Sequence, residues 1–341
     1  MWEHKWEVDS LTYPMLLTWA YYARTHDRRI FSSRLHDAMR RIVATYACEQ
    51  RHAECSHYHY PGTPTGGVPY TGMIWGAFRP SDDSVTYGFN IPQQMGALIA
   101  LEDLGTLAVI GFNDTQLAAQ AAALHVAVAA GIDRYGSVYN FRYGWIYAFE
   151  VDGRGRSIEM DDANMPNLLS IPLYGFLRAD DPRYLATRRF VLSKDNPYYY
   201  EGKYATGLGS PHTPKGWIWP LGIITRGLTA LTAHETLTAL LTLSVTDGAD
   251  GLIHESFDPN AFEHYTRADF GWGNAMYAEL LFRSAAGFAS PSLWPQTVTV
   301  VDRRMPHTPQ IVGTLAQIEN IAELISAFER DVPMQALRLG E

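Results

Sequence analysis

The chain alternates apolar stretches at helical spacing with loops that are rich in glycine, proline and aromatic residues. Apolar residues that recur every three or four positions predict helices. Short polar residues before some of these stretches, such as Ser32, Asp114 and Thr232, can cap the first helical turn. The pattern therefore predicts helices at 8–25, 33–46, 92–111, 115–130, 162–177, 182–192, 217–231, 234–245, 270–286 and 314–328.

Strand signals are fewer. Residues 143–156 alternate in polarity and contain the turn pair Asp152-Gly153, which predicts a β-hairpin. A short strand-like run follows at 298–301. Three long loops, at 53–91, 193–216 and 247–269, carry most of the remaining aromatic residues and turn formers. Loops of that length are usually either functional or disordered, and their aromatic content favours ordered, functional ones.

The order of loops and helices predicts the fold class. Polar and aromatic blocks precede the first, third, fifth, seventh and ninth helices, whereas short links precede the even ones. This order predicts a chain of helical hairpins, with the polar and aromatic residues that could bind or react with a substrate at one end of each hairpin. We expect an all-α fold, an (α/α)6 toroid that is incomplete at about five hairpins, with a small β-hairpin insertion and a single domain over 1–341. A less regular α-solenoid is the alternative.

The amino-acid composition limits the kinds of partner that the protein can bind. The net charge is −9 and no run is rich in lysine or arginine, which argues against a nucleic-acid partner. Aromatics make up 13% of the chain, with 9 Trp and 20 Tyr. Their place in the loops favours a carbohydrate site, although aromatic residues also fill large cores. No apolar run reaches the roughly 18 residues of a membrane span, so no membrane partner is expected.

Two cysteines, Cys48 and Cys55, imply no disulfide framework. A metal cluster with His52 and His57 is conceivable, but the spacing matches no usual zinc pattern. The first residues lack the apolar region of a signal peptide. With few cysteines and no visible signal, a cytoplasmic location is expected.

Carboxylates stand in the blocks that precede the odd helices. They are Glu3, Glu7 and Asp9, then Asp82 and Asp83, then Asp161 and Asp162, and finally Glu255 and Asp258. Glycoside hydrolysis uses two such groups, a protonated acid and an ionised partner. Other readings stay open: Asp161 or Asp162 can cap a helix, and the aspartate pairs can bind a divalent cation. Glu255 lies between apolar neighbours in neither a cap box nor a turn signature, which favours a functional role.

Five blocks together resemble glycoside hydrolase family 125, the exo-acting α-1,6-mannosidases. They are WEHKWEVDSL (2–11), TGMIWGAFRPSDD (71–83), MDDANMPNLLSIP (160–172), GWIWPLGIITRGL (216–228) and GLIHESFDPNAFEHYTRADFGWGNA (251–275). The resemblance implies an (α/α)6 toroid and an inverting, metal-independent mechanism without cofactors. It implies a mannose-containing glycan, an α-mannoside, as the partner. Members carry a WLRDS-type motif before the first block. This chain has no such string, so we expect a toroid truncated at its N-terminus.

The resemblance also assigns roles to residues. It implies Asp82 as the general acid, with Asp83 as its rival, and Glu255 as the general base. Sugar-binding or pocket-lining roles are implied for Arg79, Asp83, Asp161, Asp162, Asn164, His254 and Trp272. Two competing hypotheses remain at this point: an inactive or carbohydrate-binding toroid remnant, and a helical scaffold for protein partners. The scaffold is disfavoured because it needs no paired carboxylates and tryptophans at one end of every hairpin.

Overall fold

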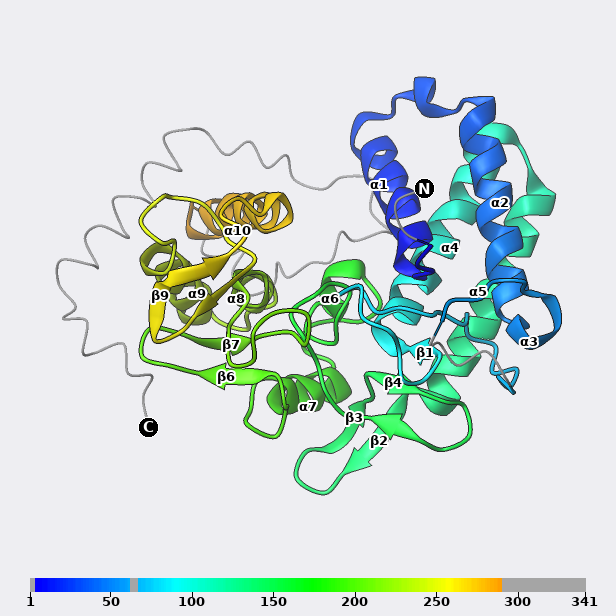
Figure 1. The fold of residues 1–341 in the computed structure, drawn as a ribbon. Coiled ribbons are helices and arrows are strands. Elements are labelled where there is room, and N and C mark those ends of the chain that lie inside the picture. The colour runs from blue at the N-terminus through cyan, green and yellow to red at the C-terminus, as the bar shows by residue number, and fades with distance from the viewer. Residues whose placement is uncertain (1–3, 62–66, 290–341) are drawn as a thin grey trace. The chain divides into compact units, whose positions relative to one another are not determined.

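The computed structural model of the protein describes residues 4–61 and 67–289, with side chains to residue 285 (Figure 1). The predicted strand at 298–301 and helix at 314–328 lie outside these residues. The chain divides into two compact units, each described here by itself. The first comprises Met1–Leu177 with Asp181–Val191, and the second Arg178–Asp180 with Leu192–Glu341. About half of the described residues are helical, which confirms a mainly helical fold.

The long helices of the first unit are α1 (Asp9–Thr25), α2 (Ser33–Glu49), α4 (Ile91–Phe112) and α5 (Thr115–Tyr135). Shorter ones are η1 (Arg28–Ile30), α3 (His52–Cys55), α6 (Ile171–Tyr174) and α7 (Pro182–Val191). Helix α4 packs against α1, α5 and α6, while α2 packs against α5 and α4. Polar and aromatic blocks precede α1, α4 and α6 in the sequence. Helix α4 contacts both of the others, so these helices lie together.

Helix α4 forms the core of the first unit. Its cap is Asn90, whose side chain accepts a hydrogen bond from the Gln93 amide, and Pro92 occupies the first turn. Helices α4 and α5 are both long and apolar enough to cross a membrane, so the sequence-based expectation of no such run was wrong. In α4, 61% of the apolar window is buried inside the protein, as in a core helix. Length and hydropathy alone do not distinguish the two situations.

Small sheets flank these helices. Strands β1 (Phe89–Asn90), β4 (Glu150–Val151) and β5 (Ser157–Ile158) form a three-stranded sheet in the order β1-β4-β5. Strands β2 (Ser137–Asn140) and β3 (Gly144–Tyr147) form a separate hairpin. The predicted turn at Asp152 does join two antiparallel strands. The strand before it is only β4, because residues 144–147 pair with the upstream β2 instead.

The second unit contains α8 (Pro220–Leu228), α9 (Ala233–Val245) and α10 (Gly271–Ala289), and α8 packs against both of the others. Two loops of the sequence analysis are hairpins here. Strand β6 (Tyr199–Glu201) pairs with β7 (Thr206–Leu208), and β8 (Ser256–Asp258) pairs with β9 (Ala261–Thr266). Sheets are therefore more numerous in the described residues than the one hairpin that was expected.

The predicted helix at 162–177 is wrong. Only its end is helical, as the single turn of α6. The preceding residues form turns because aspartate side chains hold the backbone amides that a helix would use. Asp161 accepts hydrogen bonds from the amides of Leu168 and Leu169, and Asp162 accepts one from the amide of Asn164. The irregular structure that begins at Asp161 and Asp162 therefore extends up to the start of α6.

The cysteines are also corrected. Cys48 of α2 and Cys55 of α3 form a disulfide, so the hypothetical Cys/His metal cluster is wrong. His52 Nδ1 instead shares a hydrogen bond of 2.7 Å with Oε2 of Glu49. The His52 ring also stacks on Trp75, with the ring centroids 3.6 Å apart. Disulfides are commonest in oxidising compartments. One ground for the cytoplasmic expectation is thereby removed, and the location stays a prediction.

Candidate active site

The turn at residues 79–83 presents the first candidate catalytic carboxyl, Asp82. The Arg79 amide donates to the Asp83 carbonyl at 2.8 Å, and the Asp82 amide donates back to the Arg79 carbonyl at 3.0 Å. Asp82 itself has φ +66°, a left-handed conformation that non-glycine residues seldom adopt. Its side chain is half-exposed, whereas Ser81 beside it is buried. The turn thus directs the Asp82 carboxyl outward while its neighbour Ser81 is held inside the protein.

An ion pair between Arg79 and Glu150 supports the Asp82 turn. The sequence analysis did not single out Glu150. The Arg79 guanidinium donates from Nε to the Glu150 carboxylate, which is fully buried. The second Glu150 oxygen accepts from the amides of Thr86 and Tyr87 at 2.9 and 3.0 Å. Because Glu150 lies in β4, one buried carboxylate fastens the residues on both sides of the Asp82 turn to the sheet. Only its place in an alternating stretch was visible in the sequence.

The aspartate pair at 161 and 162 is completely buried. Burial raises the pKa of Asp161 well above its usual range, although hydrogen bonds from the backbone amides of Leu168, Leu169 and Asp162 lower it. Burial likewise raises the pKa of Asp162 to about 7, while nearby Arg79 lowers it. Oδ2 of Asp162 has no donor among the described residues. Neither aspartate caps α6, so the capping alternative is wrong, and both organise the turns that hold Asn164.

Charged groups from the segment before α1 surround Asp82. Lys5 Nζ lies 3.7 Å from Asp82 Oδ1. Burial raises the pKa of the Glu7 carboxyl to about 9, with further rises from the carboxyls of Asp9 and Asp82. Burial also raises the pKa of Asp9 to about 7. The sequence analysis listed Glu7 and Asp9 as carboxylates but gave them no role.

Glu255 lies in the second unit, directly before β8. Its amide donates to the Thr266 carbonyl at 3.1 Å, which holds the residue in the β8–β9 hairpin. Arg267 Nε lies 3.2 Å from Glu255 Oε1. Although the Arg267 side chain is exposed, Glu255 is only 6% exposed. The hairpin thus holds a nearly buried carboxylate with the Arg267 guanidinium beside it.

His254 and Trp272 accompany Glu255. His254 stacks on Tyr265 with ring centroids 3.6 Å apart, and its side chain is fully buried. Both ring nitrogens face backbone carbonyls, Nδ1 that of Ala268 and Nε2 that of Asp247. Those contacts tie together the two ends of the loop before and after Glu255. Trp272 is half-buried at the start of α10, with its ring 6.1 Å from that of Phe270.

The predicted site residues therefore fall into two groups. The first unit brings Asp162 close enough to Arg79 and Asp83, at the two ends of the Asp82 turn, for their charges to shift its pKa. The second unit gathers His254, Glu255 and Trp272 around β8 and α10. Each group is built by its own unit, one around each proposed catalytic carboxylate.

Comparison with known proteins identifies the chain. The family model described as metal-independent alpha-mannosidase (GH125) matches residues 1–282. The chain belongs to glycoside hydrolase family 125. The resemblance drawn from the five sequence blocks is thereby confirmed, and the matched residues include both groups of the candidate site.

Relatives of this GH125 chain agree. A solved metal-independent alpha mannosidase from Streptococcus pneumoniae, in a non-productive complex with alpha-1,6-mannobiose, is 38% identical with a TM-score of 0.80. The alignment covers 83% of this chain and 70% of that one. The Meiotically up-regulated gene 157 protein of Schizosaccharomyces pombe is 34% identical over 301 residues, 82% of this chain. The GH125 chain spans 59% of that relative's length.

A more distant structure shares the fold alone. A bacterial glucoamylase complexed with acarbose has a TM-score of 0.52 at 16% identity, covering 81% of this chain and 40% of that one.

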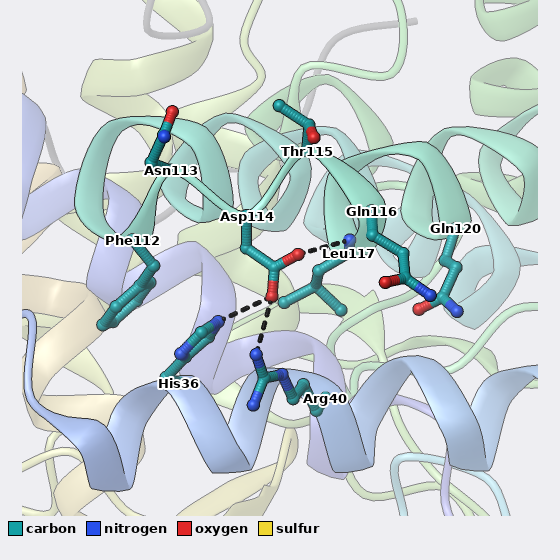
Figure 2. Close-up of a pocket in the computed structure, with 9 residues that line it drawn as sticks. All are labelled: His36, Arg40, Phe112, Asn113, Asp114, Thr115, Gln116, Leu117 and Gln120. Atoms are coloured by element: carbon teal, nitrogen blue, oxygen red, sulfur yellow. Dashed lines mark hydrogen bonds and ion pairs between the residues drawn. The ribbon is translucent and has the colours of Figure 1, made fainter.

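A pocket of about 530 Å³ lies away from the GH125 blocks, between α2 and the start of α5 (Figure 2). Its polar groups already bind one another. Asp114 caps α5 by accepting from the Leu117 amide, and it also pairs with His36 and Arg40, each at 2.9 Å. These contacts lower the pKa of Asp114 to about 2. The pocket residues come from α2, the end of α4 and the start of α5, and none of them belongs to one of the five sequence blocks.

Proposed function

We propose that the protein is an inverting, metal-independent exo-α-1,6-mannosidase that releases terminal mannose from α-1,6-linked mannosides. The family match over residues 1–282 carries this proposal. The α-1,6 linkage is supported by the mannobiose bound to the 38% identical relative. We further propose that the helical hairpins close into an (α/α) toroid with both carboxylate groups at its mouth.

The proposed reaction uses one carboxyl from each unit. Asp82 gives its proton to the glycosidic oxygen as the bond from that oxygen to C1 of mannose breaks. Glu255 takes a proton from a water molecule, whose oxygen bonds to C1 on the opposite face. The products are β-mannose and the shortened mannoside, with Asp82 ionised and Glu255 protonated. The half-exposed Asp82 and the buried Glu255 suit these roles, because the acid must reach a leaving group and the base must hold one water.

The remaining predicted residues would bind the sugar. In the first unit these would be Arg79, Asp83, Asp161, Asp162 and Asn164, and in the second unit His254 and Trp272. Asp162 offers a buried oxygen that has no donor in the part of the chain that the structure describes, which suits a sugar hydroxyl. An aromatic ring at the position of Trp272 suits the apolar face of a pyranose.

The test is hydrolysis of α-1,6-mannobiose, with the α-1,2 and α-1,3 isomers as specificity controls. Proton NMR of the first product distinguishes β-mannose, expected from inversion, from α-mannose. Asp82→Asn and Glu255→Gln should each lower the rate by about 10²-fold or more, since a positioned acid or base contributes about 10²–10⁴.

Exposed carboxylates of the same units serve as matched controls. Glu102→Gln on α4 and Glu263→Gln on β9 should leave the rate unchanged. Full activity in Asp82→Asn with loss in Asp83→Asn would move the acid to its neighbour. Binding of mannobiose without any hydrolysis would instead favour a carbohydrate-binding protein.

A further inference from the structure

The disulfide joins the end of α2 to the short helix α3. Cys55 is exposed and Cys48 is half-buried, so a reductant in solution can reach the bond. Helix α3 has only 4 residues, and so short a helix is not stable by itself. Besides the disulfide, the Glu49 carboxylate holds it, because this group shares a hydrogen bond with His52 and accepts another from the Ser56 hydroxyl at 2.6 Å. The disulfide is the covalent part of this attachment.

The residues after α3 extend the attachment to Tyr58. The Tyr58 amide donates to the Ser56 hydroxyl oxygen at 3.1 Å. The Tyr58 phenol accepts from the Trp6 amide at 3.0 Å and donates to the His4 carbonyl at 2.5 Å. These two contacts fix the backbone on both sides of Lys5. Tyr58 thus joins the disulfide-linked segment to the residues before α1.

The residues before α1 in turn bind next to the Asp82 turn. The Trp6 carbonyl accepts from the amides of Ala77 and Phe78 at 3.0 and 3.2 Å. Lys5 Nζ lies 3.7 Å from Asp82 Oδ1. Covalent bonds, hydrogen bonds and this ion pair therefore connect the disulfide to the proposed general acid.

Trp75 provides a second connection between the same two regions. Its amide donates to the carbonyl of Glu49 at 3.1 Å, and its ring stacks on that of His52. Its carbonyl accepts from the Trp6 indole at 2.8 Å. Both connections meet at Trp6, so the position of the residues before α1 depends on how firmly α3 is attached.

We propose that the Cys48–Cys55 disulfide is a redox switch for the active site, which keeps Lys5 in place beside Asp82 through Tyr58. The proposal rests on the proposed mannosidase function. A dithiol opens the bond by thiol–disulfide exchange: two electrons and two protons pass to the cysteine sulfurs, which become thiols, and the dithiol becomes a cyclic disulfide. The Tyr58 phenol is then held less firmly, and the surroundings of the half-exposed Asp82 carboxyl loosen.

The first test measures hydrolysis of α-1,6-mannobiose before and after reduction with dithiothreitol. We expect kcat to fall by about tenfold or more, because displacing a catalytic group by about 1 Å can cost about 10²-fold. Reoxidation should restore kcat. A Cys48→Ser/Cys55→Ser protein should have the low kcat in both conditions, and thermal melting checks that every assay is run on folded protein.

A tyrosine variant tests the route of the effect. Tyr58→Phe keeps the ring and removes the hydroxyl that contacts Trp6 and His4. If the disulfide acts through this hydroxyl, Tyr58→Phe should already have a low kcat. Reduction should then have little further effect, because changes within one network of contacts are not additive. Tyr139→Phe, at an exposed tyrosine on β2, should keep both the wild-type kcat and its response to reduction.

Amide hydrogen exchange gives a measurement that does not depend on activity. The amides of Ala77 and Phe78 should exchange faster in the reduced protein, because the Trp6 carbonyl that accepts from them is held less firmly. Exchange in α9, which belongs to the second unit, should not change.

The outcomes distinguish this proposal from the mannosidase function. The switch is refuted if the air-oxidised protein already has two free thiols per chain, or if kcat is the same before and after reduction. A full response to reduction in Tyr58→Phe would show that Tyr58 does not transmit the effect. If the wild-type protein hydrolyses no mannoside in either state while exchange at Ala77 and Phe78 rises on reduction, the connection stands and the mannosidase function fails.

Discussion

Replacing Glu150 with glutamine should loosen the turn that carries Asp82 without changing the shape of the side chain. The wild-type carboxylate is fully buried and accepts from Arg79, Thr86 and Tyr87. Glutamine offers one oxygen and one NH2 group in its place. Either the guanidinium or the two backbone amides must then lose their acceptor on residue 150, and in both cases the Arg79 charge loses the Glu150 carboxylate.

The size of the effect follows from burial. Arg79 is 8% exposed, so its charge would stay inside the protein without the carboxylate of Glu150. Removing one partner of a buried ion pair costs about 3–5 kcal/mol. For a protein of this size, each kcal/mol lowers Tm by about 2–4 °C. We therefore expect Glu150→Gln to melt about 6–20 °C below the wild type.

Thermal melting followed by circular dichroism at pH 7 measures this shift. Glu159→Gln is the matched control, because Glu159 is only half-buried and accepts one hydrogen bond from Asn140 at 2.8 Å. A bond of that kind contributes about 1 kcal/mol, so its Tm should fall by no more than about 4 °C. A Glu150→Gln protein that melts within 2 °C of the wild type, on the order of 1 kcal/mol or less, would refute the idea that this ion pair holds the turn.

Three other predictions concern the site and the fold. In a crystal structure with a bound mannoside, the carboxyls of Asp82 and Glu255 should lie about 6.5–9.5 Å apart; a separation near 5 Å would indicate retention of configuration. Burial raises the pKa of Asp162 to about 7, so the folded protein favours the neutral carboxyl. The stability that protonation of Asp162 contributes is complete below the unfolded pKa near 3.8 and is lost as pH rises through 7. The Tm of Asp162→Asn relative to wild type should therefore increase from pH 4 to pH 8, and a constant difference would contradict the shift. The disulfide closes a loop with a sequence separation of 7, so replacing Cys48 and Cys55 with alanine should lower the free energy of unfolding by about 2 kcal/mol in urea titrations; an unchanged midpoint would show that the bond is dispensable.

Features that depend on near neighbours in the chain were predictable. The apolar spacing and the polar caps at Ser32, Asp114 and Thr232 predicted α2, α5 and α9, and all three caps accept the expected amide hydrogen bond. Helical periodicity and capping act over three or four residues, so the sequence contains the whole interaction. The five motif blocks likewise identified the family, because each is a local string. The Glu255 and Asp82 assignments come from those strings and stay predictions.

Features that join distant segments were decided by the tertiary structure. Glu150 contacts Arg79 across 71 residues, and no local pattern marks a glutamate as the buried partner of one particular arginine. Lys5 lies 3.7 Å from Asp82 because the backbone of Trp6 docks beside Phe78. The segment after Asp161 has a helical pattern of apolar residues, yet two aspartates take the amides of that segment for themselves. Burial is what makes these contacts strong, and burial exists only once the chain has folded.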